Sequence, residues 1–175
     1  MRIRLLFLFL ILSLTGQSQT LVSGSFSLPK SEKFLTVEWD FSEAVIEQKY
    51  NEAEWKALNG EDKWTEAKDE TLTLIMREMN KNLSNSRLTI VTKESGLSFS
   101  YTIYVCPQKL FKNGNNLSLY ILKEISSGKE IGRCVIKGKG GKFGSLSNLL
   151  GDGYEEAARK MGKYLRSQKL NLKTV

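Results

Sequence analysis

The stretch that decides the fold is LSLYILKEISSGKEIGRCVIK, residues 117 to 137, in which two apolar runs flank Ser126-Ser127-Gly128-Lys129. Both runs are rich in the Leu, Ile, Val and Tyr residues that favour strands, and the short polar segment between them contains a glycine suited to a tight turn. The pattern therefore predicts a β-hairpin formed by residues 117–125 and 130–137.

Alternating apolar residues upstream predict further strands. In the first group, which covers residues 97–105, the apolar positions are Leu97, Phe99, Tyr101, Ile103 and Val105, and in the second they are Leu35, Val37, Trp39 and Phe41. A period of two places each group on one face of its strand. Pro107 is expected to end the first strand because it has no N–H to donate to a ladder. Residues 87–92 form a further strand candidate, and residues 20–28 form either a short edge strand or an extended arm.

Two segments have helical periodicity. Residues 62–83 carry apolar side chains at spacings of three and four, namely Leu72, Ile75, Met76, Met79 and Leu83. The same spacing predicts a final helix over residues 154–167, in which Gly162 suggests a close approach to the sheet. Residues 42–58 show no clear period and are interpreted as irregular or broken-helical.

The resulting order is strand, helix, four consecutive strands, helix. This order is neither a βαβ alternation nor an all-β pattern. We therefore expect an α+β two-layer sandwich, with a mainly antiparallel sheet of about five strands and two helices on one face.

The first eighteen residues have the features of a signal peptide. Arg2 and Arg4 precede an apolar run over residues 5–14, and Gly16 and Ser18 provide small residues for cleavage. An uncleaved anchor is the alternative, but the run is shorter than the ~20 residues that span a bilayer. We expect a periplasmic or secreted protein, a single domain over residues 19–175, and no stable membrane span after cleavage.

Charge and composition exclude several classes of protein. The chain has 26 basic and 19 acidic residues, a formal charge of +7, which becomes +5 without Arg2 and Arg4. This excess favours anionic partners without specifying one, and export makes nucleic acid an unexpected partner. Histidine is absent, which removes the commonest general base and zinc ligand. No metal site and no cofactor are predicted.

The only two cysteines are Cys106 and Cys134. Pairing Ile125 with Glu130 in the predicted hairpin puts Cys134 opposite Ile121, on the face of Leu117 and Leu119. Cys106 is out of phase with the apolar positions of its own strand, so it is expected on the other face. The two thiols are therefore expected to stay unpaired, although an oxidising compartment favours a disulfide.

The most distinctive stretch is glycine-rich and basic. Its candidate binding residues are Lys139, Gly140, Gly141, Lys142, Phe143, Gly144 and Ser145. Backbone N–H groups in such turns can hold an anion, and the lysines can neutralise its charge. The dinucleotide and Walker A patterns both fail at Phe143. The alternative, which we favour, is that these glycines serve backbone packing.

Carboxylates are the only plausible catalytic groups. Glu38 and Asp40 project from the same side of one strand, about 7 Å apart by strand rise, which is a separation compatible with glycoside hydrolysis. Alternating acids on a strand are more often solvated surface. Asp152, between two glycines, is expected to help start the last helix.

The stretch GKGGKFGSLSNLLGDGYEEAARKMGKYL, beginning at Gly138, resembles a signature of secreted proteins of Gram-negative envelopes to which no activity is attached. The likeness extends to Ser-Gly-Ser at 23–25 and to a strand ending Trp39-Asp40-Phe41-Ser42. More distantly, the layout is similar to periplasmic domains of outer-membrane assembly lipoproteins. Unlike those proteins, this chain has no lipidation cysteine after its leader.

Together these observations predict a binding or interaction protein of the cell envelope without catalysis. Its partner would be an envelope protein or an anionic envelope component. Two alternatives remain: a carboxylate-dependent glycan hydrolase, and a purely structural domain with no exposed apolar or basic patch.

Overall fold

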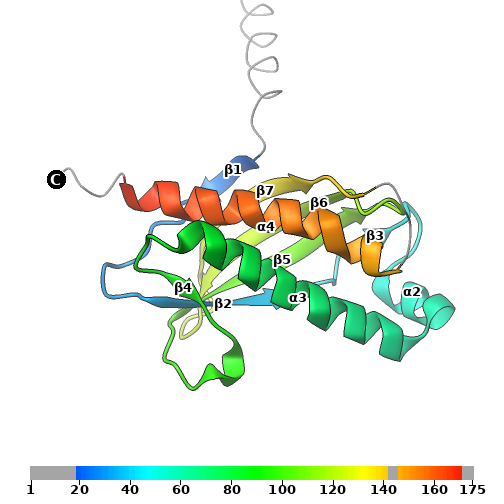
Figure 1. The fold of residues 1–175 in the computed structure, drawn as a ribbon, viewed down its shortest axis with the longest axis horizontal. Helices are drawn as coiled ribbons and strands as arrows, with labels where there is room; N and C mark the ends of the chain where they lie inside the picture. The colour runs from blue at the N-terminus through cyan, green and yellow to red at the C-terminus, as the bar shows by residue number, and fades with distance from the viewer. Residues whose placement is uncertain (1–18, 142–145, 171–175) are drawn as a thin grey trace, which may run out of the picture.

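A computed structural model describes residues 19–141 and 146–170 of the chain (Figure 1). These residues form one seven-stranded sheet with the order β1-β7-β6-β5-β2-β4, and β3 pairs with the far end of β5. The strands are β1 (Gln19–Gly24), β2 (Phe34–Trp39), β3 (Val45–Ile46), β4 (Thr89–Ile90), β5 (Tyr101–Leu110), β6 (Asn116–Glu124) and β7 (Glu130–Gly138). The helices are α2 (Glu52–Asn59), α3 (Glu61–Leu83), the short 3-10 turn η2 (Lys93–Ser95) and α4 (Leu146–Leu170).

The predicted α+β sandwich is confirmed. The long helices α3 and α4 lie side by side on one face of the sheet, and α2 sits at one end (Figure 1). The sheet is wider than expected and mostly antiparallel. Its parallel pairs are β4 with β2, β2 with β5 and β3 with β5, and the helices α2 and α3 lie in the chain between β2 or β3 and these later partners. Of residues 20–28, those up to Gly24 belong to an edge strand, since β1 pairs only with β7, and residues 25–28 lie outside the strands.

The expectation that Pro107 ends its strand is wrong, because β5 continues to Leu110. Asp40 N–H donates to the Val105 carbonyl at 3.0 Å, so the backbone groups of Val105 point toward β2. Because these directions alternate along a strand, the backbone of Pro107 is directed to the same side. There β2 has already ended opposite Val105, and β3 begins only opposite Lys109. Pro107 therefore occupies a gap between two partners, where no N–H is required.

The predicted hairpin is confirmed, but its register differs. Near the turn Glu130 pairs with Lys123 rather than with Ile125, a shift of two residues. An irregularity between Leu122 and Lys123 then reduces the shift to one, so Cys134 pairs with Tyr120 rather than with Ile121. A slip of one residue exchanges the two faces of a strand. The inner face of β6 therefore carries Tyr120, and Cys134 lies beneath it in the core with no exposed surface.

The helices differ from the predictions at their ends. Residues 42–58 contain β3 and much of α2, a short helix capped by Asn51 through a reciprocal pair of hydrogen bonds with Glu54. Helix α4 begins at Leu146, so Asp152 lies inside the helix and does not start it. Gly162 approaches α3 rather than the sheet, since a Cβ there would stand 2.9 Å from the Met79 carbonyl oxygen.

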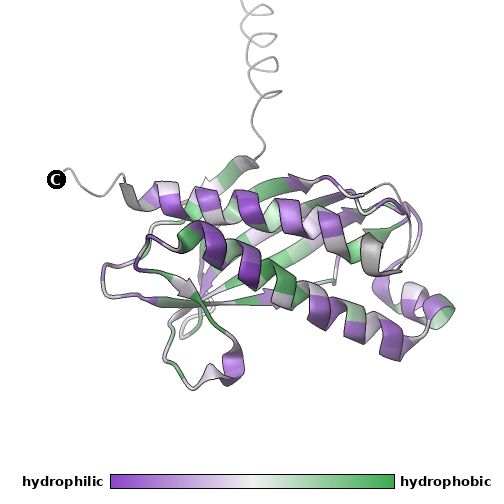
Figure 2. Cartoon of the chain, viewed as in Figure 1, coloured by the Kyte–Doolittle hydropathy of each residue, from purple (hydrophilic) through white to green (hydrophobic). Residues whose placement is uncertain are grey.

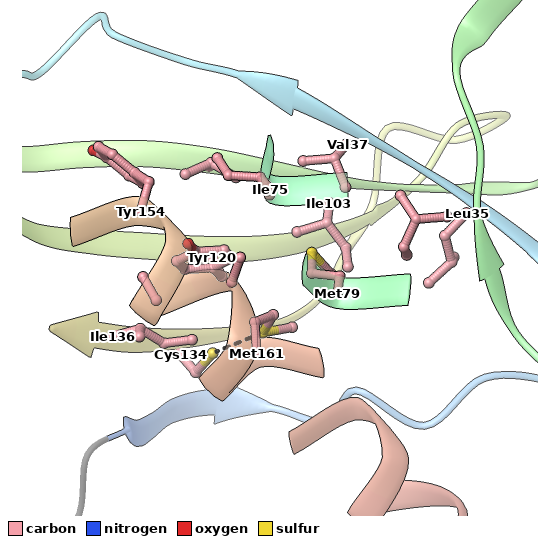
Figure 3. Close-up of a cluster of buried hydrophobic side chains, with 14 of the residues drawn as sticks. Leu35, Val37, Ile75, Met79, Ile103, Tyr120, Cys134, Ile136, Tyr154 and Met161 are labelled. Atoms are coloured by element: carbon pink, nitrogen blue, oxygen red, sulfur yellow. Dashed lines mark hydrogen bonds between the residues drawn. The ribbon is translucent and has the colours of Figure 1, made fainter. Parts of the chain in front are cut away.

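The core lies between the sheet and the two long helices. Figure 3 shows Ile75 and Met79 of α3 and Tyr154 and Met161 of α4 directed toward side chains of the sheet. Hydrophilic residues predominate on the outer side of both helices (Figure 2). At the α2 end, Trp64 has no exposed surface, and its ring packs edge-on against Phe41 and Trp55.

Both thiols should resist alkylation in the native protein and react once the protein is unfolded. Cys106 and Cys134 are free and buried on opposite faces, and burial raises the pKa of each to about 12. Because the thiolate is the reactive form, its scarcity and inaccessibility both slow the reaction. Thiol titration with and without urea checks this. Rapid native labelling, or the absence of free thiol in urea, would contradict it.

Candidate functional site

The glycine-rich segment leaves the sheet at the end of β7 and leads toward α4. Of the predicted binding residues, Lys139, Gly140 and Gly141 belong to the part of the chain that the structure describes. The other candidates, Lys142, Phe143, Gly144 and Ser145, lie outside the described residues. The site is therefore built from the end of β7, the β5–β6 turn and the first turns of α4.

Close backbone packing explains two of the glycines at this end of the sheet. A Cβ on Gly138 would overlap the Gly153 carbonyl oxygen, and a Cβ on Gly153 would overlap the Gly114 carbonyl oxygen. The side-chain amide of buried Asn116 lies beside both glycines. The β5–β6 turn, β7 and α4 thus meet backbone to backbone, which only glycine permits.

The loop amides are already bonded within the protein. Lys139 N–H donates to the Glu156 carboxylate at 2.5 Å, and Gly140 N–H donates to the Asn115 side-chain oxygen at 2.8 Å. These two N–H groups are not directed at a ligand. Any anion at this site would be held by side chains rather than by these amides.

Those side chains are lysines that converge from three elements on a cavity of about 600 Å³. Lys109, Leu117 and Lys137 form one row across β5, β6 and β7, because each pairs directly with the next. Lys139, Lys160 and Phe111 also line the cavity. The volume lies in the range of small-ligand pockets, and the lining combines cations with an apolar surface.

One carboxylate belongs to this cavity. Burial alone raises the pKa of Glu156, but hydrogen bonds from the Lys139 amide and from Lys160 outweigh it, so the pKa is lowered. Ionised Glu156 pairs with Lys160 at 3.1 Å, and Lys160 also donates to the Lys137 carbonyl at 2.7 Å. Among the described residues, the ammonium groups of Lys109, Lys137 and Lys139 form no ion pair.

The sequence singled out only Lys139 of the described lysines. Lys109 and Lys137 are distant in sequence, and they become neighbours only through the pairing of both with Leu117. One pattern in the sequence could have indicated them: each lysine lies near the carboxyl end of its strand, on the strand face that Leu117 occupies in β6. Lys160 could not be predicted as a lining residue without knowing where α4 packs.

The acids that sequence analysis considered for catalysis have other roles. Glu38 pairs with Lys93 at 2.8 Å. The Asp40 carboxylate accepts hydrogen bonds from Ser42, which lower its pKa, whereas a general acid needs a raised one. Within residues 19–141 and 146–170, no group of three Cys, Asp or Glu side chains is placed to bind a metal ion. No helix in these ranges has the length and apolar character to cross a bilayer.

No protein-family model matches the chain, and no curated protein matches it at a significant level. Among solved structures, two PelC dodecamers from Paraburkholderia phytofirmans are similar to this chain, one of them a variant with a single substitution. Both comparisons have 10% identity, with TM-scores of 0.42 and 0.41, and cover 83% and 82% of this chain and 98% of PelC.

A candidate lipoprotein from Caulobacter crescentus is also similar, with 14% identity and a TM-score of 0.26, over 58% of this chain and 80% of that one. TM-scores this low say nothing of what the chain binds. The resemblance to secreted envelope proteins therefore stays a prediction from sequence.

Proposed function

We propose that the protein is an exported binding module of the cell envelope that holds an anionic group of its partner in the lysine-lined cavity. The observation that carries the proposal is the convergence of Lys109, Lys137 and Lys139 without matching carboxylates. A phosphate, sulfate or carboxylate group fits this charge, and Phe111 and Leu117 offer apolar surface to the carbon skeleton beside it.

The charge of the whole chain supports the same partner class. An excess of basic residues attracts anions at long range, and a cavity with several cations concentrates that attraction at one place. The leader at residues 1–18 supports export, so the anion belongs to an envelope component rather than to nucleic acid.

Catalysis has less support. Cleavage by a carboxylate pair needs one group that stays protonated, and the Ser42 hydrogen bonds favour the ionised form of Asp40. Glu38, the second carboxylate of the predicted pair, forms an ion pair with Lys93. We therefore propose binding without chemistry.

Reversing two lysine charges tests the proposed function. The variant Lys109→Glu/Lys139→Glu should elute from a heparin column at clearly lower salt, and its affinity for heparin should fall by roughly tenfold or more, about 1.4 kcal/mol. Neither ammonium makes an ion pair within the described residues, so the fold should remain intact.

The matched control is Lys63→Glu/Lys129→Glu, which changes the net charge equally at exposed positions outside the cavity. It should retain affinity within about twofold, because distant charges are screened by salt. Equal losses in the two variants would mean that heparin senses only net charge, and the proposed site would be wrong.

A further inference from the structure

The strand β2 has an open edge over its second half. Asp40 N–H bonds to Val105 of β5, while Val91 N–H bonds to the Leu35 carbonyl at 2.8 Å on the opposite side. By alternation, the backbone N–H and C=O groups of Val37 and Trp39 point away from β5, to the side of β4. The pairing with β4 stops at Leu35, because β4 is only two residues long.

These backbone groups have no partner within residues 19–141 and 146–170. After Val91 the chain turns into η2, and no hydrogen bond to the N–H of Val37 or Trp39 is formed there. Val37 is only 2% exposed, and buried backbone donors are almost always paired in proteins. An unpaired, nearly buried strand edge is therefore a position that an added strand would satisfy.

The open edge lies in a groove of about 470 Å³ between β2 and α3. Leu72 and Met76, one helical turn apart on α3, form its apolar wall, and η2 closes the other side. The indole N–H of Trp39 donates to the Lys68 carbonyl of α3 at 3.0 Å, which fixes the helix beside the strand. A strand edge facing a helix across a groove is the arrangement by which several domains bind extended peptides.

The charges of the groove indicate the chemistry of its occupant. Lys93 is paired with Glu38, whereas the exposed carboxylates of Asp69 and Glu94 form no ion pair within the described residues. We infer that a short, extended, basic peptide segment of a partner protein binds here as an added strand on β2. Its backbone would pair with Val37 and Trp39, its apolar side chains would contact Leu72 and Met76, and its basic side chains would meet Asp69 and Glu94. This site is separate from the lysine-lined cavity, so either can fail without the other.

Selection of random short peptides displayed on phage tests the inference with the full mature chain. Enriched peptides should alternate apolar and basic residues. Amide hydrogen exchange at Val37 and Trp39 should slow when a selected peptide is added, because those N–H groups become bonded. N-methylation of the peptide backbone should abolish binding.

The variant Asp69→Lys/Glu94→Lys should weaken a selected peptide by roughly tenfold, and the matched control Glu66→Lys/Glu70→Lys, on α3 outside the groove, should leave it nearly unchanged. All four positions are exposed, so folding should be preserved. The inference is overturned if no peptide is enriched, or if both variants bind equally. It is also overturned if the Val37 and Trp39 amides become protected by concentration-dependent self-association, since the occupant would then be a second copy.

Discussion

Replacing Gly153 by alanine should lower the free energy of unfolding by more than about 3 kcal/mol, because the new Cβ would overlap a main-chain oxygen. The oxygen belongs to Gly114, in the turn between β5 and β6, and it cannot move as a side chain could. Relief would require α4 to shift away from the β5–β6 turn, which would open the packing around buried Asn116 and Tyr154. Urea denaturation measures the change.

Gly151 provides the control two residues earlier on the same helix. A Cβ there meets nothing within 4 Å, so Gly151→Ala should stabilise the protein by up to about 1 kcal/mol through helix propensity alone. If both substitutions stabilise, α4 does not approach the turn as closely as described, and the packing explanation of the glycines is wrong.

Replacing Trp64 by alanine should cost about 3–5 kcal/mol of unfolding free energy, the range for a fully buried large aromatic side chain. Its indole packs against Phe41 with ring centroids 5.5 Å apart. Its N–H donates to Glu52 at 2.8 Å, and that carboxylate also pairs with Lys68 at 2.7 Å. The substitution therefore removes apolar packing and one hydrogen bond to a charged acceptor.

Leu58→Ala is the matched control near the same end of the molecule. Leu58 lies on α2 and is 63% exposed, so its truncation should change stability by less than about 0.5 kcal/mol. Thermal unfolding of both variants distinguishes the two cases. A loss below about 1 kcal/mol for Trp64→Ala would place this tryptophan outside the core.

The fold class could be predicted from sequence because apolar periodicity reports which side chains are buried. The long helix α3 and the strands around Val37 and Ile103 follow such patterns directly. The register of the β6–β7 hairpin could not be predicted. It depends on where the turn closes, since Ile125 lies in the turn rather than opposite Glu130, and on the irregularity beside Leu122. No residue type in the turn predicts either feature. The two thiols nevertheless lie on opposite faces of the sheet, as predicted. The predicted register put Cys134 on the face of Leu119, whereas Cys134 pairs with Tyr120, and Leu119 itself lies opposite Cys106, so the two errors cancel.

The strand β5 shows a second limit. Proline is depleted from central strands because its missing N–H breaks a ladder. Whether Pro107 breaks one depends on its neighbours, and here β2 and β3 leave a gap beside it. The sequence shows that Pro107 lacks an N–H donor, but not that no acceptor lies opposite it.

The candidate site was located only in part. The glycine-rich motif leads to the end of the sheet where the proposed site lies and contributes Lys139. Close backbone packing explains Gly138 and Gly140, as in the alternative interpretation. The cationic lining comes mainly from Lys109, Lys137 and Lys160, which tertiary structure alone brings together. A motif confined to one loop cannot reveal binding residues that come from several secondary-structure elements.

The central claim is that an anion is held among these lysines, and the most direct measurement is an NMR titration of the isotopically labelled protein with inorganic pyrophosphate. The lysine-lined cavity predicts saturable shifts confined to resonances of residues 109–117, 137–140 and 156–160. Shifts scattered over exposed lysines throughout the chain, or no saturable shifts at all, would contradict the claim.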